Sequence, residues 1–171
     1  DAFSPEAVQK LLDAKGRGRQ SPPPVLIPNV ATLAALAADP NDSITAFAEA
    51  FWPGALTIVT RANPSLSWDL GEMGGTVALR IPNQALALEL LQETGPLAVS
   101  SANKTGEPAA RTADAARAML GDDVAVYLEA GESDGDGEAS TIVDATALTE
   151  TGGELRILRQ GAVSREAIAA R

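Results

Sequence analysis

Residues 76–103 have the sequence TVALRIPNQALALELLQETGPLAVSSAN, in which a strand, a helix and a second strand follow one another. Residues 76–81 are rich in β-branched and aliphatic side chains, which predicts a strand that Pro82 ends. Leucines at 86, 90 and 91 recur at helical spacing over residues 84–94, and Gly95-Pro96 ends this helix. Residues 97–100 predict the next strand. This alternation indicates an α/β fold.

The rest of the chain continues the alternation of short helices and strands. Ser4 and Pro5 form an N-terminal capping pattern, and the helix that they begin is predicted to end near Gly16. Further helices are predicted at residues 30–38, 43–51, 112–120 and 164–171, and further strands at 25–27, 56–60, 124–128, 140–143 and 155–158. We therefore expect one α/β domain with a mixed sheet over residues 1–171.

The composition excludes several kinds of site. The chain has neither Cys nor His, so a typical zinc site and the Ser-His-Asp or Cys-His nucleophilic schemes cannot be built from it. We expect no zinc, haem or flavin, and a chemistry that depends on positioning, cations and backbone donors. No apolar run approaches the roughly 18 residues that cross a bilayer, and no signal-peptide pattern opens the chain. We expect a cytoplasmic protein without membrane contact.

The charge is strongly acidic but unevenly distributed. The formal net charge is −10, which disfavours a general nucleic-acid-binding surface because phosphate affinity comes from clustered Lys and Arg. Residues 121–155 carry ten acids and no base, whereas four cations lie in the first twenty residues: Lys10, Lys15, Arg17 and Arg19. A local cationic site on an acidic body suits a small anionic ligand better than a duplex.

Two loops are candidates for that site. In Lys15-Gly-Arg17-Gly-Arg19, glycines let the chain bring cations and amide N–H groups against phosphate oxygens. The alternative is a solvated basic loop, since the prolines up to Pro24 exclude regular helix and predict exposure. Residues 100–106, SSANKTG, follow a strand directly, where open α/β sheets usually hold ligands. The alternative there is an ordinary polar turn.

Two arginines lie in or at the end of apolar strands. Arg80 interrupts the apolar run Val77-Ala-Leu-Arg-Ile81, and Arg159 ends the strand before Gln160. A cation in such a place is costly unless it is paired. Its partner is either a carboxylate of the protein or the carboxylate of a ligand, and the sequence favours neither.

Seven short motifs stand in an order that resembles the YrdC-like threonylcarbamoyl-AMP synthase family over nearly the whole chain. They are Lys15-Gly-Arg17, Trp52-Pro-Gly-Ala-Leu-Thr57, Thr76-Val-Ala-Leu-Arg-Ile-Pro82, Ser101-Ala-Asn103, Gly106-Glu-Pro108, Ser140-Thr-Ile-Val-Asp144 and Ile157-Leu-Arg-Gln-Gly161. Each motif is weak evidence by itself, but seven motifs do not occur in this order with compatible spacing by chance. The basic loop and Trp68-Asp-Leu70 further resemble actinobacterial members of the family.

The resemblance implies a YrdC-like twisted open α/β sheet with flanking helices and a concave, positively lined cavity. It implies a nucleotidyltransferase that joins L-threonine, bicarbonate and ATP, with Mg²⁺, to give threonylcarbamoyl-AMP and pyrophosphate. The adenylate would pass to a downstream threonylcarbamoyl-transfer complex that modifies tRNA. Contact with tRNA or double-stranded RNA is a further implication.

The resemblance also implies roles for individual residues. Lys15 and Arg17 match the family's Lys-x-Arg element, and Ser101 and Asn103 match its Ser-x-Asn element, so these four are the expected catalytic residues. ATP contacts are implied for Arg17, Ser21, Thr76, Ser101 and Arg159, and threonine contacts for Arg80 and Ser100. No protein residue is expected to bind a metal ion.

Some positions depart from the family pattern. Ser21 stands where many members have Asn, Leu26 where many have His, Ala109 where many have Ser, and Gln160 where many have Pro. Members normally begin with a strand and a Pro-Thr-Asp-Thr-Val-Tyr-Gly-Leu segment, and Asp1-Ala-Phe3 matches the residues just after it. We therefore expect this piece to lack that segment.

Two other functions stay open at this point. One is a non-catalytic double-stranded-RNA-binding module of the same fold, against which the acidic balance counts. The other is a carbamoyl-transferring domain like those fused in hydrogenase-maturation proteins, which usually sit among zinc-finger and acylphosphatase-like regions.

Overall fold

The computed structural model describes residues 1–133, 137–149 and 153–171, and it contains a six-stranded sheet. The strands are β1 (Val25–Leu26), β2 (Leu56–Arg61), β3 (Thr76–Arg80), β4 (Leu97–Ala98), β5 (Thr141–Asp144) and β6 (Arg156–Arg159). Their order across the sheet is β4-β1-β3-β2-β5-β6. Strands β1 and β3 run parallel, as do β2 and β5, whereas the other three neighbouring pairs are antiparallel. The predicted α/β fold with an open mixed sheet is confirmed.

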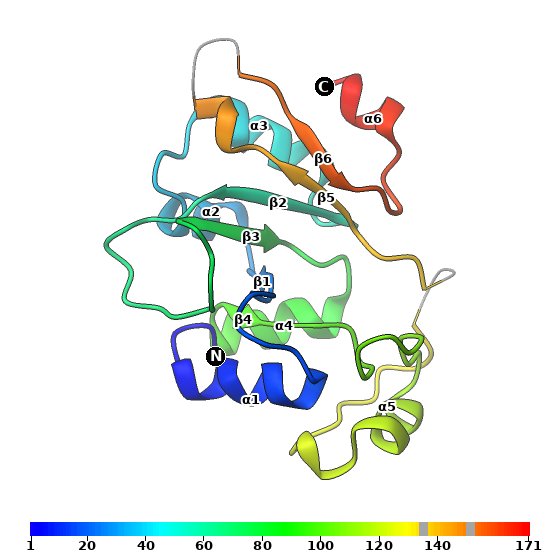
Figure 1. Ribbon diagram of the computed structural model, residues 1–171. Coiled ribbons are helices and arrows are strands. Elements are labelled where there is room, and N and C mark those ends of the chain that lie inside the picture. The colour runs from blue at the N-terminus through cyan, green and yellow to red at the C-terminus, as the bar shows by residue number, and fades with distance from the viewer. Residues whose placement is uncertain (134–136, 150–152) are drawn as a thin grey trace.

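Six α-helices accompany the sheet, and each begins at a polar side chain that accepts a backbone N–H. They are α1 (Pro5–Lys15), α2 (Val30–Leu36), α3 (Asp42–Phe51), α4 (Ala85–Thr94), α5 (Ala113–Leu120) and α6 (Arg165–Ala169). Their caps are Ser4, Asn29, Asn41, Gln84, Thr112 and Ser164. Figure 1 shows α1 and α4 at the end of the sheet where β1 and β4 lie, with α5 set to one side of them.

The core lies where the central strands meet the helices. Val25, Ile58, Leu79 and Val143 of four adjacent strands have no exposed surface, and helix residues such as Leu33 are equally buried. Burying an aliphatic side chain of this size contributes about 1.5–3 kcal/mol, so these contacts hold the sheet and its covering helices together. No helix within the described ranges has the length and apolar character needed to cross a membrane.

The prediction of a strand at residues 124–128 was wrong. In the structure these residues form neither strand nor helix, and Val126 and Leu128 are 69% and 57% exposed. Their apolar, β-rich run fits a strand, but no described strand pairs with them, and an unpaired segment has no ladder to join. The final helix also ends earlier than predicted, at Ala169.

Candidate functional site

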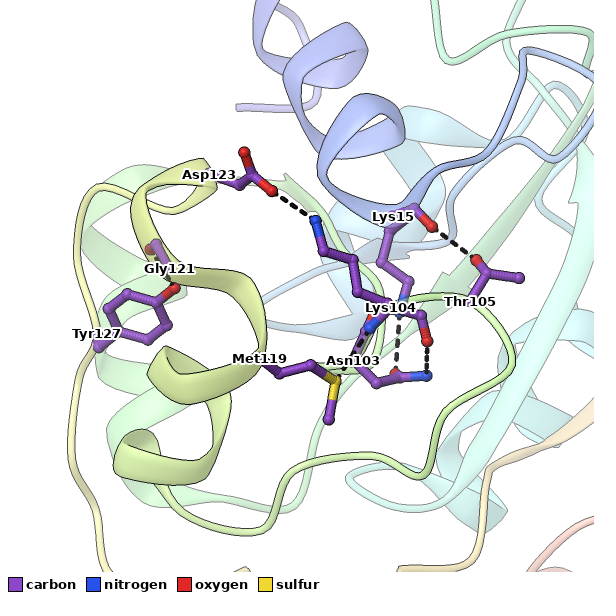
Figure 2. Close-up of polar contacts among 8 residues, drawn as sticks. All are labelled: Lys15, Asn103, Lys104, Thr105, Met119, Gly121, Asp123 and Tyr127. Atoms are coloured by element: carbon purple, nitrogen blue, oxygen red, sulfur yellow. Dashed lines mark hydrogen bonds and ion pairs between the residues drawn. The ribbon is translucent and has the colours of Figure 1, made fainter.

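Lys15 is the last residue of α1, and its side chain points into the protein. Gly16 ends the helix in the left-handed conformation with φ of 66°, which a residue without Cβ adopts at little cost. The Lys15 ammonium donates to the Ser101 carbonyl at 2.7 Å, to Asn103 Oδ1 at 2.9 Å and to the Asn103 carbonyl. Figure 2 shows the Lys15 side chain directed at Asn103. The resemblance implied a shared role for Lys15, Ser101 and Asn103, and the structure brings these three residues into direct contact.

The alternative interpretation of the basic segment, a solvated loop, does not hold for Lys15. Only 3% of the residue is exposed, because the end of α1 packs against residues 101–105. Burial of the ammonium and the nearby charge of Arg17 lower the pKa of Lys15, whereas its hydrogen bonds to oxygen atoms favour the charged form. An ammonium has three protons, and all three are directed at oxygens of the turn.

Asn103 forms the centre of this turn. The residue is 7% exposed, and its amide nitrogen donates to the carbonyls of Lys104 at 2.9 Å and Glu107 at 2.7 Å. Its backbone N–H donates to the Ser101 carbonyl at 2.9 Å. Every polar atom of the side chain is therefore used to fix the turn, and Lys15 completes the network.

Arg17 and Thr105 add a second contact between the two segments. Arg17 Nε donates to Thr105 Oγ1 at 3.0 Å, and that hydroxyl donates to the Lys15 carbonyl at 2.8 Å. On the other side of the turn, the Lys104 N–H meets Met119 Sδ at 3.2 Å, and Lys104 Nζ lies 2.5 Å from an Asp123 carboxylate oxygen. Figure 2 shows that these contacts join the turn to α1 on one side and to α5 on the other.

Arg80 ends strand β3, half-buried, and is oriented by the chain that follows α3. Its Nε donates to the Gly54 carbonyl at 2.8 Å. Burial and the charge of Arg159 lower the pKa of Arg80, so two cations lie near one another. Among the described residues no carboxylate lies within ion-pair distance of either arginine. Of the two partners that the sequence left open for Arg80, a ligand carboxylate is the one that this geometry favours.

Arg159 is held by the start of β5. Its guanidinium donates to the Ser140 carbonyl at 2.7 Å and 3.2 Å, and to Ser140 Oγ at 3.3 Å. Ser140 Oγ also lies 2.8 Å from Thr57 Oγ1, and both hydroxyl side chains are buried. The sequence analysis named neither residue individually, although both belong to motifs that it quoted. The sequence signal that could have indicated these two residues is the small hydroxyl side chain in each motif.

The four cations predicted as site residues differ from five other cations of the described chain in their contacts with carboxylates. The five others meet carboxylates: Lys10 with Glu6, Arg19 with Asp69, Lys104 with Asp123, Arg111 with Glu132, and Arg156 with Asp144. Within the described ranges, Lys15, Arg17, Arg80 and Arg159 meet none. In a chain of net charge −10, acids are abundant, so these four positions are suited to an anion from outside.

A cavity of about 730 Å³ opens beside this group, between α1, α4, α5 and residues 124–133. Lys15, Arg80, Ser100 and Ser101 line it, so the structure brings cations of two candidate motifs and the hydroxyls of a third to one space. Arg111 lines it too and donates to the Ser133 carbonyl at 2.8 Å. The sequence analysis missed Arg111, because its position before a helix gives no signal of a ligand.

Of the five predicted ATP contacts, Ser101 lines this cavity, whereas Arg17, Ser21, Thr76 and Arg159 do not. Thr76 begins β3, so about 13 Å of strand separates it from Arg80, and its hydroxyl donates to the Met73 carbonyl at 2.7 Å. The Ser21 N–H donates to the Gly18 carbonyl at 3.1 Å, and Ser21 is not among the residues that line the cavity. Their roles toward ATP stay predictions without support from this geometry.

Comparison with known proteins agrees with this arrangement. The Sua5/YciO/YrdC family model, described as telomere recombination, matches residues 1–161. The chain belongs to the Sua5/YciO/YrdC family. A Mycobacterium tuberculosis relative named provisionally as threonylcarbamoyl-AMP synthase is 50% identical over 169 residues, which are 99% of this chain and 75% of the relative. The resemblance to actinobacterial members of the family agrees with this match.

More distant Sua5/YciO/YrdC relatives share the same fold. The threonylcarbamoyl-AMP synthase of Bacillus subtilis is 32% identical over 172 residues, which cover 99% of this chain and 48% of the relative. The structure of Pyrococcus abyssi Sua5 complexed with L-threonine superposes with a TM-score of 0.86 at 29% identity, covering 99% of this chain and 48% of that chain. The chain thus spans about half the length of the Bacillus and Pyrococcus relatives.

Proposed function

We propose that this chain is an L-threonylcarbamoyladenylate synthase and that residues 1–171 act as one YrdC-like domain. The reaction joins L-threonine, bicarbonate and ATP to give threonylcarbamoyl-AMP, pyrophosphate and water. Relatives with the name of this synthase support the proposal at 50% and 32% identity over 99% of the chain. The observation that carries it is the buried contact of Lys15 with Ser101 and Asn103, which joins the basic segment to the polar turn beside the cavity that Arg80 also lines.

Arg80 is proposed to bind the carboxylate of threonine. Its guanidinium is oriented by Gly54, lines the cavity and meets no carboxylate of the described chain. A planar guanidinium matches a carboxylate with two parallel N–H···O bonds. Ser100 lies in the same lining and is proposed to contact the threonine. The amine of threonine is then held where it attacks bicarbonate-derived CO2 to form the carbamate.

The phosphates of ATP are proposed to lie between the basic segment and Arg159. Arg17 and Arg159 provide the nearby guanidinium groups, and Ser101 provides a hydroxyl at the cavity. Because all three ammonium protons of Lys15 are already used, Lys15 contributes its positive charge and the position of the turn. The carbamate oxygen attacks the α-phosphorus and pyrophosphate leaves, a step that depends on alignment and charge neutralisation.

Mg²⁺ is proposed to enter with ATP, bound to its phosphates. Within the described ranges no three His, Cys, Asp or Glu side chains gather in a way that could hold a metal ion. This donor set does not fit an ion held by the protein, and we derive no step through one. We further propose a cytoplasmic location and transfer of the adenylate to a tRNA-modifying complex. The net charge of −10 counts against the rival double-stranded-RNA-binding function, and within the described ranges five cations already meet acids.

The test is pyrophosphate release that requires threonine and bicarbonate together, with the adenylate identified by mass spectrometry. Arg80→Ala is expected to raise the KM for threonine far more than the KM for ATP, by a factor corresponding to about 2–5 kcal/mol. Arg165→Ala, which removes an exposed arginine of α6, is the matched control. A folded wild-type chain that binds neither ATP nor threonine in calorimetry, or equal KM changes in Arg80→Ala, would refute the assignment.

A further inference from the structure

Residues 68–72 form a firmly held turn in the connection between β2 and β3. Trp68 is 9% exposed and stacks on Phe3 with ring centroids 5.4 Å apart, and Leu70 is 1% exposed. Asp69 lies between them with its side chain on the surface, where its Oδ1 accepts the Gly71 N–H at 3.1 Å. The buried residue on each side fixes the position from which this carboxylate projects.

This turn contacts the basic loop, residues 16–21, through both side chain and backbone. The Arg19 guanidinium lies 2.5 Å from Asp69 Oδ1, and the Glu72 N–H donates to the Arg19 carbonyl at 2.8 Å. The hydrogen bond from Arg19, together with the Gly71 N–H, lowers the pKa of Asp69, so the carboxylate is charged at neutral pH. The loop is therefore restrained at Arg19 as well as at its start.

Gly71 allows this close approach. A Cβ added there would lie 2.6 Å from the Arg19 carbonyl oxygen, closer than real Cβ atoms come to such an atom. Its φ of +109° is also one that side chains with a Cβ rarely adopt. The turn thus requires glycine both for its own conformation and for its contact with the loop.

Arg19, where the loop is restrained, is close to Arg17 of the candidate site. Arg19 follows Arg17 by two residues, so their Cα atoms are at most about 7 Å apart. Arg17 contacts Thr105 of the turn that holds Lys15. The Arg17 N–H donates to the Leu12 carbonyl at 2.9 Å, but Gly18 makes the backbone after Arg17 permissive.

We propose that Asp69 and Gly71 are positioning residues that hold the basic loop at Arg19 and thereby set the place of Arg17 for the phosphates of ATP. This role rests on the proposed synthase function. The contact of Arg17 with Thr105 and the contact of Arg19 with residues 69–72 act as two fixed points, and the loss of either lets the loop move. Neither Asp69 nor Gly71 touches a substrate.

Limited trypsin digestion tests the restraint without any activity. Trypsin cleaves after Arg17 and Arg19 only when the loop leaves its folded position. Asp69→Asn is expected to raise the rate of cleavage at these two sites by about two- to five-fold, the range for a half-exposed ion pair. Asp39→Asn makes the same chemical change at an exposed position outside the site and is expected to leave the rate unchanged.

Steady-state kinetics test the role toward ATP. In Asp69→Asn the KM for ATP is expected to rise about two- to five-fold while the KM for threonine stays within error. Asp69→Glu is expected to restore most of the loss. The ratio of the variant's KM to the wild-type KM is expected to fall toward one at 1 M salt, because both side chains of the pair are almost half exposed. A loss of general stability would not separate the two substrates in this way.

Gly71→Ala gives an independent perturbation, because it displaces the Arg19 backbone and leaves both charges in place. We expect at least the same rise in trypsin cleavage and in the KM for ATP, and no fall of the KM ratio toward one at 1 M salt. Unchanged cleavage in both Asp69→Asn and Gly71→Ala overturns the restraint. Faster cleavage with an unchanged KM for ATP, or with equal KM changes for both substrates, overturns the positioning role. Absence of pyrophosphate release by the wild type refutes the synthase function instead, and trypsin alone then decides the restraint.

Discussion

Lys15→Met is the substitution whose effect on folding the structure predicts most sharply. It replaces a buried ammonium by an apolar group of similar length and leaves three oxygens of Ser101 and Asn103 without their donor. Each buried acceptor left unpaired costs about 1–3 kcal/mol. The loss is partly offset because the ammonium no longer has to be buried, a cost that the lowered pKa of Lys15 reflects. We expect a net loss of about 2–4 kcal/mol in the free energy of unfolding.

Urea unfolding followed by tryptophan fluorescence measures this loss, with Lys10→Met as the matched control. Lys10 is 73% exposed in its pair with Glu6, so its replacement is expected to cost less than about 1 kcal/mol. Asn103→Ala combined with Lys15→Met is expected to cost less than the sum of the single changes, because the two share a hydrogen bond. A loss in Lys15→Met no larger than in Lys10→Met would refute the reasoning from burial.

The lowered pKa of Lys15 also fixes the sign of a pH effect. Between the folded pKa and the ordinary value of 10.5, the unfolded chain binds the Lys15 proton more tightly than the folded chain does. The contribution of this group to the free energy of unfolding therefore rises with pH through that window, and the full cost of burying the charge is present below it. Lys15→Met is expected to remove this slope, and an identical slope in the variant would contradict the assignment.

Three further predictions concern buried or paired polar groups. The Thr60 hydroxyl is buried and has no hydrogen-bond partner among the described residues. Thr60→Val should therefore raise Tm by about 2–4 °C in calorimetry. A lower Tm would show that the hydroxyl does form a hydrogen bond. Ser140→Ala should lower the free energy of unfolding by about 1–3 kcal/mol, because it leaves the Thr57 hydroxyl without its partner. The loss should be smaller in a Thr57→Val background, and additive losses would contradict this reasoning. Lys104→Met should cost at most about 1 kcal/mol, because its pair with Asp123 is half exposed, and the loss should shrink in salt.

Local patterns predicted most of the helices and strands. The caps at Ser4, Thr112 and Ser164 and the helix stop at Gly16 depend on neighbours within a few residues, and the structure contains all of them. Residues 124–128 show the limit of such reasoning. An apolar, β-rich run shows that a segment suits a strand, but whether a partner strand lies beside it depends on residues far away in the sequence.

The candidate site could be predicted only in part, again because its contacts join residues that lie far apart in the sequence. The motifs indicated that Lys15 and Asn103 act together, yet the burial of Lys15 depends on contacts between residues 86 and 88 positions apart. The sequence left the partner of Arg80 undecided, because only the fold shows that no carboxylate of the described chain reaches it. Arg111 was missed because its place in the cavity is set by the packing of α5 and by the contact with Ser133.

The distribution of acids around the cations distinguishes a small anionic ligand from a long nucleic acid. In a chain with an excess of acids, carboxylates would be expected to neutralise every buried or half-buried cation. Asp69 does so for Arg19, the arginine of the loop farthest from the cavity. Two residues earlier, Arg17 contacts a hydroxyl instead, and Arg80 contacts a carbonyl. Neutral oxygens orient a guanidinium without cancelling its charge. The site therefore keeps its positive charge at a few fixed points, while the acidic surface around it repels extended polyanions such as RNA.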